Sequence, residues 1–472
     1  MTIQQVEFLV VGGGPGGTPA AMALASAGKS VMLVEKGQGL GGTCLFEGCI
    51  PSKILRETAR RLRELKQAQQ FGLCLPTQDV SVNWSAVQQR KHSILAKRSH
   101  AALQKSQKLT NLKTLFGVCR LLDSHSAVVK TQDGEAFEVH FEKAILATGS
   151  VPFIPPIKGS DLPRVHDSES ILNIDHIPER LVIIGGGPIG VELGQVFNTL
   201  GSEVSILETA SRILGPVDEE LAERLQQRML DDGIDIHVNC KVQGILTTGQ
   251  NVFVEYVTAD GAEQHKLADT VLMVTGRRPN VEGLGLENTG VQHDAHGITV
   301  SETLQTDDTG IYAVGDVIGQ PMFAHWATAQ GLALARHLTE QPVKFPLKEN
   351  NSAVIFSEPE IGIAGLTEQQ AKQAGMKIQV IRYDYKQDAR AQITGSADGL
   401  LKIIFDVDSR RIVGVHILVE GAGELMGEAA LLVKTGVPIE TIAGAIHPHP
   451  TLSESFVMAV RNMLAQAAAK NK

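Results

Sequence analysis

The sequence has few of the features that mark a secreted, membrane-bound or nucleic-acid-binding protein. Its 472 residues include only five cysteines, an odd number spread along the chain, which does not predict a disulfide framework. No apolar run reaches the roughly 20 residues needed to span a bilayer, and the first residues contain no basic leader. We therefore expect a cytoplasmic protein without membrane contact.

Charge excludes a further class of partner. The chain carries 43 basic and 52 acidic residues, a net charge of −9, and no run of Lys or Arg long enough to follow a phosphate backbone. We expect no nucleic-acid partner. With 43% hydrophobic and 20% charged residues, the composition is that of a globular protein, and the length allows three or four domains.

Two of the cysteines, Cys44 and Cys49, stand five positions apart in the segment GGTCLFEGCIPSK. A disulfide that closes so short a loop constrains the unfolded chain by only roughly 2 kcal/mol, so it is a weak structural staple. A zinc site would need a second pair of ligands, whereas Cys74, Cys119 and Cys240 stand alone. The pair therefore predicts a redox dithiol and no metal.

Residues 7–36 have the pattern of a βαβ unit: an apolar strand, a glycine turn, a small-residue helix and a second strand. Gly12, Gly14 and Gly17 form G-x-G-x-x-G, the arrangement that gives a tight turn, close approach to a pyrophosphate and close helix packing. Glu35 ends the second strand, where a carboxylate can hold ribose hydroxyls. The unit predicts a dinucleotide site.

The same pattern recurs later, with Gly185, Gly187 and Gly190 in the turn and Glu208 at the end of the second strand. Two such units predict two bound dinucleotides. A carboxylate at the position of Glu208 accepts a ribose 2′-hydroxyl and repels a 2′-phosphate, which favours NAD over NADP. Arg212 tempers this preference, although a single basic residue in a loop is usually solvated.

Seven motifs, in order, resemble those of the FAD-dependent class I pyridine nucleotide–disulfide oxidoreductases, most closely the dihydrolipoamide dehydrogenases. They are GGGPGG, GGTC-x4-C-x-PSK, ATG, GGGPIGVE, GRRPN, YAVGD and HPHPTLSE. The resemblance covers essentially the full chain and implies an α/β fold with two Rossmann-like domains, for FAD and NAD, and a C-terminal α+β dimerisation domain. The expected segments are 1–150 for FAD binding, 151–275 for NAD binding, 276–345 completing the FAD site, and 346–472 for the dimer interface.

The resemblance also implies which residues contact the cofactors. For FAD they are Gly12, Gly14, Gly17, Glu35, Thr43, Lys53, Thr148, Gly149 and Asp316. For NAD they are Gly185, Gly187, Gly190 and Glu208, and Gly276 is a further cofactor contact. Lys53 and Glu192 match a pair that lies near the flavin ring in relatives.

In the redox reaction, the resemblance places Cys49 against the flavin as the charge-transfer thiolate and gives Cys44 the exchange with substrate. A thiol with a pKa near 8.5 is a poor nucleophile at neutral pH, so a nearby base is needed. The family pattern assigns this role to His449, with Glu454 orienting its ring, while His447 is interpreted as a loop histidine. In relatives this segment reaches into the other subunit, which implies a homodimer.

The implied reaction is oxidation of dihydrolipoyl groups to the disulfide with reduction of NAD to NADH, in either direction. The expected partner is dihydrolipoamide or a lipoylated carrier, as in a 2-oxo acid dehydrogenase or glycine-cleavage complex. Phe46, Glu47, Trp326 and Gln330 depart from the usual pattern and leave the disulfide substrate open. The alternatives are an NADH-dependent reductase of the same family with another small or protein disulfide as substrate, and a flavoprotein that is mainly a binding component of a multienzyme complex.

Overall fold

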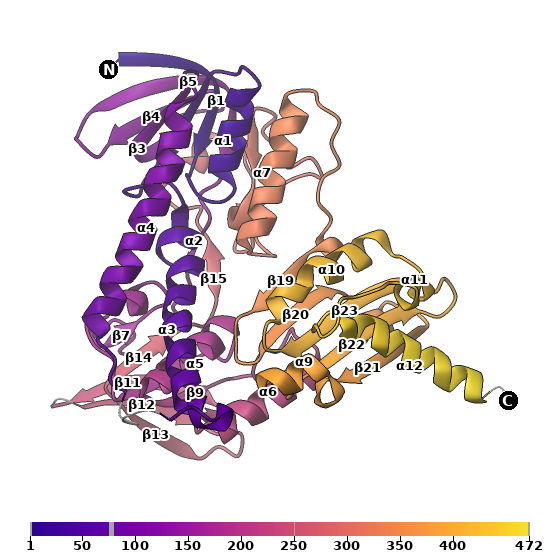
Figure 1. Ribbon diagram of the computed structural model, residues 1–472. Helices are drawn as coiled ribbons and strands as arrows, with labels where there is room; N and C mark the ends of the chain where they lie inside the picture. Colours follow the sequence, from indigo (N-terminus) through magenta and orange to yellow (C-terminus); the bar gives the residue numbers. More distant parts are fainter. Residues whose placement is uncertain (1, 75–79, 250, 471–472) are drawn as a thin grey trace. The chain divides into compact units, whose positions relative to one another are not determined.

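The structure is a computed structural model that describes residues 2–74, 80–249 and 251–470. It contains two compact units, each assembled from stretches that are distant in the sequence (Figure 1). The first unit comprises the chain as far as Pro156, His166–Ile177 and Met273–Pro346. The second comprises Ile157–Val165, Pro178–Leu272 and the chain from Leu347. The four segments expected from the sequence stay a prediction about domain boundaries.

The first unit is built on a six-stranded sheet. Its strands are β1 (Thr2–Val11), β2 (Val31–Glu35), β3 (Leu112–Leu121), β4 (Ser126–Thr131), β5 (Ala136–Leu146) and β18 (Ile311–Ala313). Five of them, all except β4, are parallel: Val11 pairs with Val34 of β2 and with Leu146 of β5, Leu146 pairs with Ala313 of β18, and β2 pairs with β3. Because parallel strands end at one edge, the loops after β1, β2, β5 and β18 meet where α/β sheets bind nucleotides.

Helices α1 (Gly17–Ser26) and α7 (Ala324–Leu338) lie side by side against one face of this sheet (Figure 1). Their close approach depends on glycine, since a Cβ on Gly331 would lie 2.3 Å from the backbone oxygen of Gly16. Two longer helices, α3 (Cys49–Gln67) and α4 (Trp84–Gln107), pack on each other. The shorter elements of the unit are α2 (Gly42–Phe46), η1 (Ala68–Phe71), β6 (Ser150–Pro152), η2 (Ser170–Asn173), β15 (Arg277–Pro279), η3 (Leu286–Asn288), β16 (His293–Asp294), β17 (Gly297–Ile298) and η4 (Gly315–Ile318).

The second unit begins with another nucleotide-type sheet, in the order β10-β9-β8-β14-β7. Its strands are β7 (Val165–His166), β8 (Arg180–Ile184), β9 (Glu203–Leu207), β10 (Asp235–His237) and β14 (Thr270–Met273), and its helices are α5 (Pro188–Leu200) and α6 (Glu219–Asp231). An antiparallel sheet adds β11 (Lys241–Thr248), β12 (Asn251–Val257) and β13 (Glu263–Ala268). The recurrence of strand, glycine turn and helix therefore gives a second fold of the same type.

The C-terminal part of the second unit is an antiparallel sheet with helices, in the order β19-β20-β23-β22-β21. Its elements are η5 (Lys348–Asn350), β19 (Ser352–Ile355), β20 (Glu360–Gly365), α8 (Glu368–Gln373), β21 (Ile378–Asp384), η6 (Tyr385–Gln387), α9 (Ala389–Thr394), β22 (Leu400–Asp406), β23 (Ile412–Val419), α10 (Ala422–Thr435), α11 (Ile439–Ala443) and α12 (Glu454–Lys470). Alternate residues of β22, such as Leu401, Ile403 and Phe405, enter one apolar core with α10 and α12. The remaining residues of that strand face the opposite side, toward α6 and α8.

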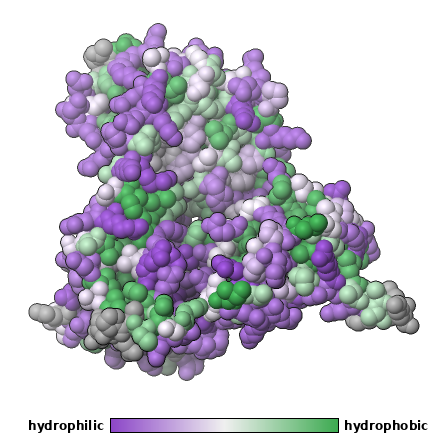
Figure 2. Space-filling model, viewed as in Figure 1, coloured by the Kyte–Doolittle hydropathy of each residue, from purple (hydrophilic) through white to green (hydrophobic). Residues whose placement is uncertain are grey.

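Polar side chains cover most of the face seen in Figure 2, with smaller apolar patches between them. Exposed apolar side chains of the C-terminal part include Leu431, Ile446 and Met458. Each helix in the described part of the chain is too short or too polar to cross a membrane.

Candidate active site

The turn after β1 has the shape that the first glycine motif predicts. Gly12 has a φ of +107°, and a Cβ there would lie 2.2 Å from the backbone oxygen of Ala147. A Cβ on Gly17 would lie 1.9 Å from the backbone oxygen of Gly12, so only glycine lets α1 begin here. Gly14 differs, because its Cβ would meet only the Cα of Gly42, at 3.8 Å. The space beside Gly14 fits a pyrophosphate, which the N–H groups at the start of α1 would bind.

Glu35 links this turn to the end of β2. Its Oε2 accepts a hydrogen bond of 2.5 Å from the Gly13 N–H, and its Oε1 accepts one of 2.6 Å from the Gly37 N–H. The side chain is buried, and these two donors fix its orientation. Since each carboxylate oxygen can accept a second hydrogen bond, the group also fits ribose hydroxyls. The ribose contact itself stays a prediction.

The second glycine motif repeats this geometry closely. A Cβ on Gly190 would lie 2.1 Å from the backbone oxygen of Gly185, whereas a Cβ on Gly187 would meet nothing within 4 Å. Glu208 accepts hydrogen bonds from the N–H of Gly186 at 2.6 Å and of Ala210 at 2.7 Å. The two sites therefore have the same arrangement. In each, the middle glycine of the motif faces open space, and backbone N–H groups orient the carboxylate of the glutamate.

The guanidinium of Arg212 forms hydrogen bonds with the backbone of residues that follow it closely in the chain. It donates to the backbone oxygens of Leu214 at 2.9 Å, Gly215 at 2.7 Å and Val217 at 3.0 Å. These bonds hold the loop after β9 and occupy the donors that could otherwise bind a 2′-phosphate. The arrangement favours NAD at the second site, as Glu208 also does.

The redox loop, residues 41–53, lies against the first glycine turn. Gly41 and Gly42 have φ values of +137° and +55°, and a Cβ on Gly42 would lie 2.7 Å from the Cα of Gly14. Cys44 lies in α2, and Cys49 is the first residue of α3. Neither cysteine forms a disulfide, and their sulfurs share a hydrogen bond. The structure thus contains the dithiol form of the predicted redox pair.

Electrostatics distinguish the two thiols. The hydrogen bond to Cys49, burial, and the negative charge on Cys49 raise the pKa of Cys44, while Lys53 and Arg98 lower it. Cys49 is at the N-terminus of a 19-residue helix, where free N–H groups and the helix dipole stabilise a thiolate. When the dithiol loses its first proton, the negative charge therefore resides on Cys49. This order suits the predicted roles of the two cysteines.

Arg98 is a charged neighbour of the dithiol that the sequence analysis missed. Leu95 of the same helix shares an apolar cluster with Leu45, and a Cβ on Gly39 would lie 2.2 Å from the Ser99 hydroxyl. Residues 95, 98 and 99 occupy one face of α4, which packs on the redox loop. The i, i+3, i+4 spacing of these residues predicts that they share one face of a helix, but it does not predict which segment packs against that face.

The unusual Phe46 has a packing role at the same place. Its side chain packs against the cluster of Leu45, Ile54 and Leu95, and its ring lies 3.2 Å from where a Cβ on Gly39 would be. The side chain therefore joins the redox loop to α4. We assign Phe46 to anchoring the loop.

Two further predicted positions follow β5 and β18. Gly149 has a φ of +73°, and the Thr148 hydroxyl donates to the backbone oxygen of Asn280 at 2.7 Å. Asp316 lies in η4, where its Oδ2 accepts a hydrogen bond of 2.7 Å from the Ser150 hydroxyl. Burial raises the pKa of Asp316, while the bond from Ser150 and a nearby guanidinium lower it.

The unusual Gln330 and Trp326 are both buried in α7. Gln330 accepts a hydrogen bond of 2.9 Å from the N–H of Gly315, the residue before Asp316, so it supports this turn. Gly276, the remaining predicted contact, has a φ of +127°, and a Cβ at this position would meet nothing within 4 Å. Its conformation and open surroundings fit close approach of a ligand.

Three predicted residues, Thr43, Lys53 and Glu192, have contacts within the protein. Lys53 lies one turn into α3, where its Nζ is 3.4 Å from the Ser52 hydroxyl. The backbone oxygen of Thr43 accepts a hydrogen bond of 2.9 Å from the N–H of Glu47. Glu192 belongs to the second unit and accepts a 2.8 Å hydrogen bond from the N–H of Phe356. The proximity of Lys53 and Glu192 stays a prediction.

The predicted base and its partner meet in the second unit. Nδ1 of His449 lies 3.1 Å from both carboxylate oxygens of Glu454, and the ring is largely exposed. The N–H of Thr451 donates to Glu454 at 2.9 Å, and this bond together with His449 lowers the pKa of Glu454. An ionised Glu454 fixes the imidazole with Nε2 directed away, as a base requires. His447 instead lies 3.0 Å from Glu428 and is mostly buried.

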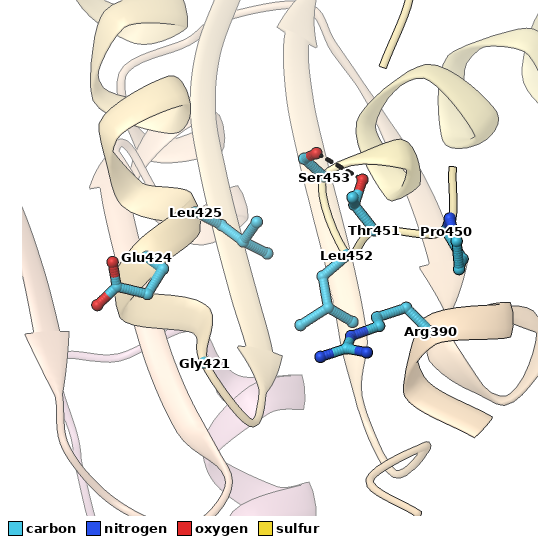
Figure 3. A pocket seen from close by; sticks show the side chains of 8 residues that line it. All are labelled: Arg390, Gly421, Glu424, Leu425, Pro450, Thr451, Leu452 and Ser453. Carbon is cyan, nitrogen blue, oxygen red and sulfur yellow. Dashed lines mark hydrogen bonds between the residues drawn. The ribbon is translucent and has the colours of Figure 1, made fainter. Parts of the chain in front are cut away.

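An open pocket adjoins this base segment (Figure 3). It is lined by Arg390 of α9, by Gly421, Glu424 and Leu425 at the start of α10, and by residues 450–453. The hydroxyls of Thr451 and Ser453 share a 2.9 Å hydrogen bond that shapes the loop (Figure 3). In the described residues, no three His, Cys, Asp or Glu side chains are grouped as a metal site.

Two nucleotide folds and a dithiol together define an oxidoreductase that moves electron pairs between a thiol couple and dinucleotides. Comparison with known proteins agrees: the family model "Pyridine nucleotide-disulphide oxidoreductase" matches residues 6–331, and the dimerisation domain of that family matches residues 351–460. The chain belongs to this family. The predicted fold class and family are confirmed, and the cofactors of the family are FAD and NAD, as predicted. The dimerisation domain supports a homodimer.

Several relatives are similar over nearly their whole length. The chain is 34% identical to "Dihydrolipoyl dehydrogenase" of Bacillus subtilis, covering 96% of this chain and 97% of the relative. It is 36% identical to the protein of the same name from Haloferax volcanii, covering 98% and 97%. A solved structure, the copper(II) complex of the HOCl-induced flavoprotein disulfide reductase RclA from Escherichia coli, has a TM-score of 0.87 at 28% identity, covering 97% and 99%.

Proposed function

We propose that this chain oxidises dihydrolipoyl groups to the cyclic disulfide and reduces NAD to NADH. The observation that carries the proposal is the Cys44–Cys49 dithiol, placed at the start of a long helix and beside a dinucleotide turn. The full-length similarity to dihydrolipoyl dehydrogenases supports the substrate class. The roles of individual residues below are part of the proposal.

The exchange begins with the Cys44–Cys49 disulfide. His449 takes a proton from a substrate thiol, and the resulting thiolate attacks Cys44, forming a substrate–Cys44 disulfide and releasing Cys49 as thiolate. The second substrate thiol then attacks the substrate sulfur of that bond, and its proton passes to the departing Cys44 sulfur. The substrate leaves as a disulfide, and the enzyme keeps both electrons as the Cys44 thiol and the Cys49 thiolate, with the first proton on His449.

The dithiol of the structure is suited to the next step. Negative charge resides on Cys49 because Cys44 donates to it and α3 begins there. Bound FAD would supply the route by which the electron pair of the dithiol reaches NAD as hydride. Glu35 and Asp316 would hold the FAD, and Glu208 the NAD ribose, while His449 and Glu454 hold the proton removed from substrate.

The partner is a lipoyl group supplied by free dihydrolipoamide or by a lipoylated carrier of a 2-oxo acid dehydrogenase or glycine-cleavage complex. The cytoplasmic location stays a prediction. A homodimer in which His449 serves the active site of the other subunit completes the proposal. The exposed Leu431, Ile446 and Met458 of the dimerisation domain suit burial by a second copy.

The test is steady-state reduction of NAD by dihydrolipoamide with FAD-loaded protein, with NADP as the alternative acceptor. Cys44→Ser should abolish turnover, and His449→Gln should reduce it by about 10² to 10⁴, the usual contribution of general acid–base catalysis. Cys74→Ser removes an exposed thiol outside the redox loop and serves as the matched control, with unchanged turnover expected.

One result would reject this substrate: a flavin that NADH reduces readily while dihydrolipoamide is inert. Glutathione disulfide and copper(II) are then the acceptors to compare, because they represent another disulfide and a metal ion. Turnover that survives in Cys44→Ser would reject the dithiol mechanism.

A further inference from the structure

A chain of hydrogen bonds leads from Arg277 to Asp316. The antiparallel pair of β6 and β15 brings Arg277 next to Ser150. The guanidinium donates through Nε to the Ser150 hydroxyl at 2.8 Å and through Nη2 to the Ser150 backbone oxygen at 2.9 Å. The same hydroxyl then donates to Oδ2 of Asp316 at 2.7 Å.

The direction of this chain is fixed by chemistry. A guanidinium can only donate, so the oxygen of Ser150 must accept from Arg277. The single hydroxyl proton of Ser150 is then available for Asp316, and a carboxylate accepts it more strongly than a protonated carboxyl group does. Ser150 is buried and Arg277 is 15% exposed, so water does not readily replace either bond. The contacts therefore favour the ionised form of Asp316.

Asp316 retains capacity for a ligand. Among the described residues it has one hydrogen-bond donor, Ser150, on Oδ2, and Oδ1 is left to accept from another group. Of the elements packed on its turn, β17 consists of Gly297 and Ile298, and α7 contributes the amide of Gln330. Arg277 of β15 is the cation that acts on this carboxylate.

Arg277 also holds a second carboxylate. Its Nη2 lies 3.0 Å from Glu169, whose pKa is raised by burial and by the charge of Glu47 in the redox loop, and lowered by Arg277. Nη1 adds a 3.3 Å hydrogen bond to the Ser168 hydroxyl. One guanidinium thus fixes residues 168–169 and the Asp316 turn together, a task that needs several donors in a planar arrangement.

We propose that Arg277 is a positioning residue of the flavin site: acting through Ser150, it keeps the Asp316 carboxylate ionised and oriented to accept a hydrogen bond from a hydroxyl of bound FAD. This inference rests on the FAD site of the proposed function. It assigns no step of the reaction to Arg277, which does not touch the cofactor.

The test is FAD binding to the full-length protein stripped of flavin, measured by fluorescence titration between pH 5 and 8. Arg277→Gln and Ser150→Ala should each weaken FAD binding about 10- to 100-fold at pH 7, the range for a hydrogen bond to a charged group. Arg277→Lys keeps the charge but not the multiple bonds, so its affinity should be intermediate. Arg278→Gln is the matched control, since this neighbour is 43% exposed and pairs with Glu282 at 2.6 Å.

The pH dependence separates positioning from simple structural damage. FAD binding weakens as the pH falls, because Asp316 becomes protonated. If Arg277 keeps Asp316 ionised, this loss should begin at a higher pH in Arg277→Gln and Ser150→Ala than in the unmodified protein. Unchanged FAD affinity in both variants would overturn the proposal, and so would an equal loss at every pH. Because the titration needs no lipoyl substrate, its result is independent of whether dihydrolipoamide is oxidised.

Discussion

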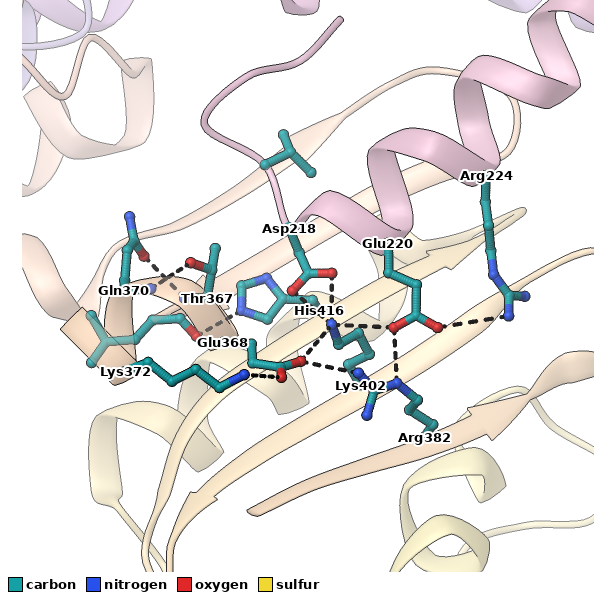
Figure 4. A network of polar contacts seen from close by, with 12 residues as sticks. Asp218, Glu220, Arg224, Thr367, Glu368, Gln370, Lys372, Arg382, Lys402 and His416 are labelled. Carbon is teal, nitrogen blue, oxygen red and sulfur yellow. Dashed lines mark hydrogen bonds and ion pairs between the residues drawn. The ribbon is translucent and has the colours of Figure 1, made fainter. Parts of the chain in front are cut away.

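Replacement of Lys402 by methionine should strongly destabilise the second unit. Lys402 lies in β22 with its side chain 3% exposed, and its Nζ contacts both oxygens of Asp218 at 2.8 Å (Figure 4). Glu368 at 3.2 Å and Glu220 at 3.3 Å complete its surroundings. Removing one partner from a buried ion pair typically costs about 3 to 5 kcal/mol, because the remaining charge is left uncompensated.

The same cluster supplies a matched control in Lys372. This lysine also pairs with Glu368, at 2.7 Å, but its side chain is 63% exposed (Figure 4). Exposed pairs contribute about 0 to 1 kcal/mol, so Lys372→Met should change stability little. Because a unit of about 150 to 250 residues shifts by roughly 2 to 4 °C per kcal/mol, Lys402→Met should lower the Tm by about 6 to 20 °C.

The assay is thermal unfolding by calorimetry, with hydrogen exchange of β22 to locate the loss. The hydrogen bond from Lys372, together with Lys402 and the charge of Arg382, lowers the pKa of Glu368 to about 2 from its ordinary value of 4.5. The stabilisation from ionised Glu368 is therefore present above pH 4.5 and is lost as the pH falls toward 2. The difference in Tm between the unmodified protein and Lys402→Met should become smaller over that range. A Tm of Lys402→Met within 2 °C of that of Lys372→Met, the equivalent of about 1 kcal/mol, would refute this reasoning.

Three further predictions concern the active site. Gly14→Ala should fold but bind FAD poorly, because its Cβ would enter the open space that the pyrophosphate needs. Gly17→Ala should fail to fold normally, because its Cβ would lie 1.9 Å from a backbone oxygen. Circular dichroism and flavin content distinguish the two variants. Arg98→Gln removes a charge that lowers the pKa of Cys44, so alkylation of Cys44 in the reduced protein should begin at higher pH, and an unchanged pH profile would contradict this. Glu454→Gln should slow turnover by about tenfold or more through loss of ring orientation, and equal rates would show that the carboxylate is not needed.

Much of the site could be predicted from the sequence because its requirements are local. The turn at Gly12 and the helix start at Gly17 demand glycine for reasons of sterics within a few residues, and the spacing to Glu35 follows from one βαβ unit. The closeness of Cys44 and Cys49 is likewise set by five positions of chain. The resemblance of seven motifs to a known family implied the family and the fold class.

Other features depend on segments that are far apart in the chain. Arg98 approaches the dithiol because Leu95 of α4 packs against α2, and Gln330 supports the turn at Gly315 from a helix that begins after it. In the sequence each is an ordinary residue of a helix. Their functions were therefore missed or left open.

The sequence by itself determined the two nucleotide turns and the redox pair, since each lies within one short segment whose backbone geometry the residues dictate, while the resemblance to a known family implied the pair of His449 and Glu454. Only the tertiary structure decided which charges act on these groups. Asp316 receives its hydrogen bond from Ser150, 166 positions away, and Lys402 finds Asp218 across 184. Such partners are set by packing of whole elements, because burial and hydrogen bonding act between neighbours in space regardless of their distance along the chain.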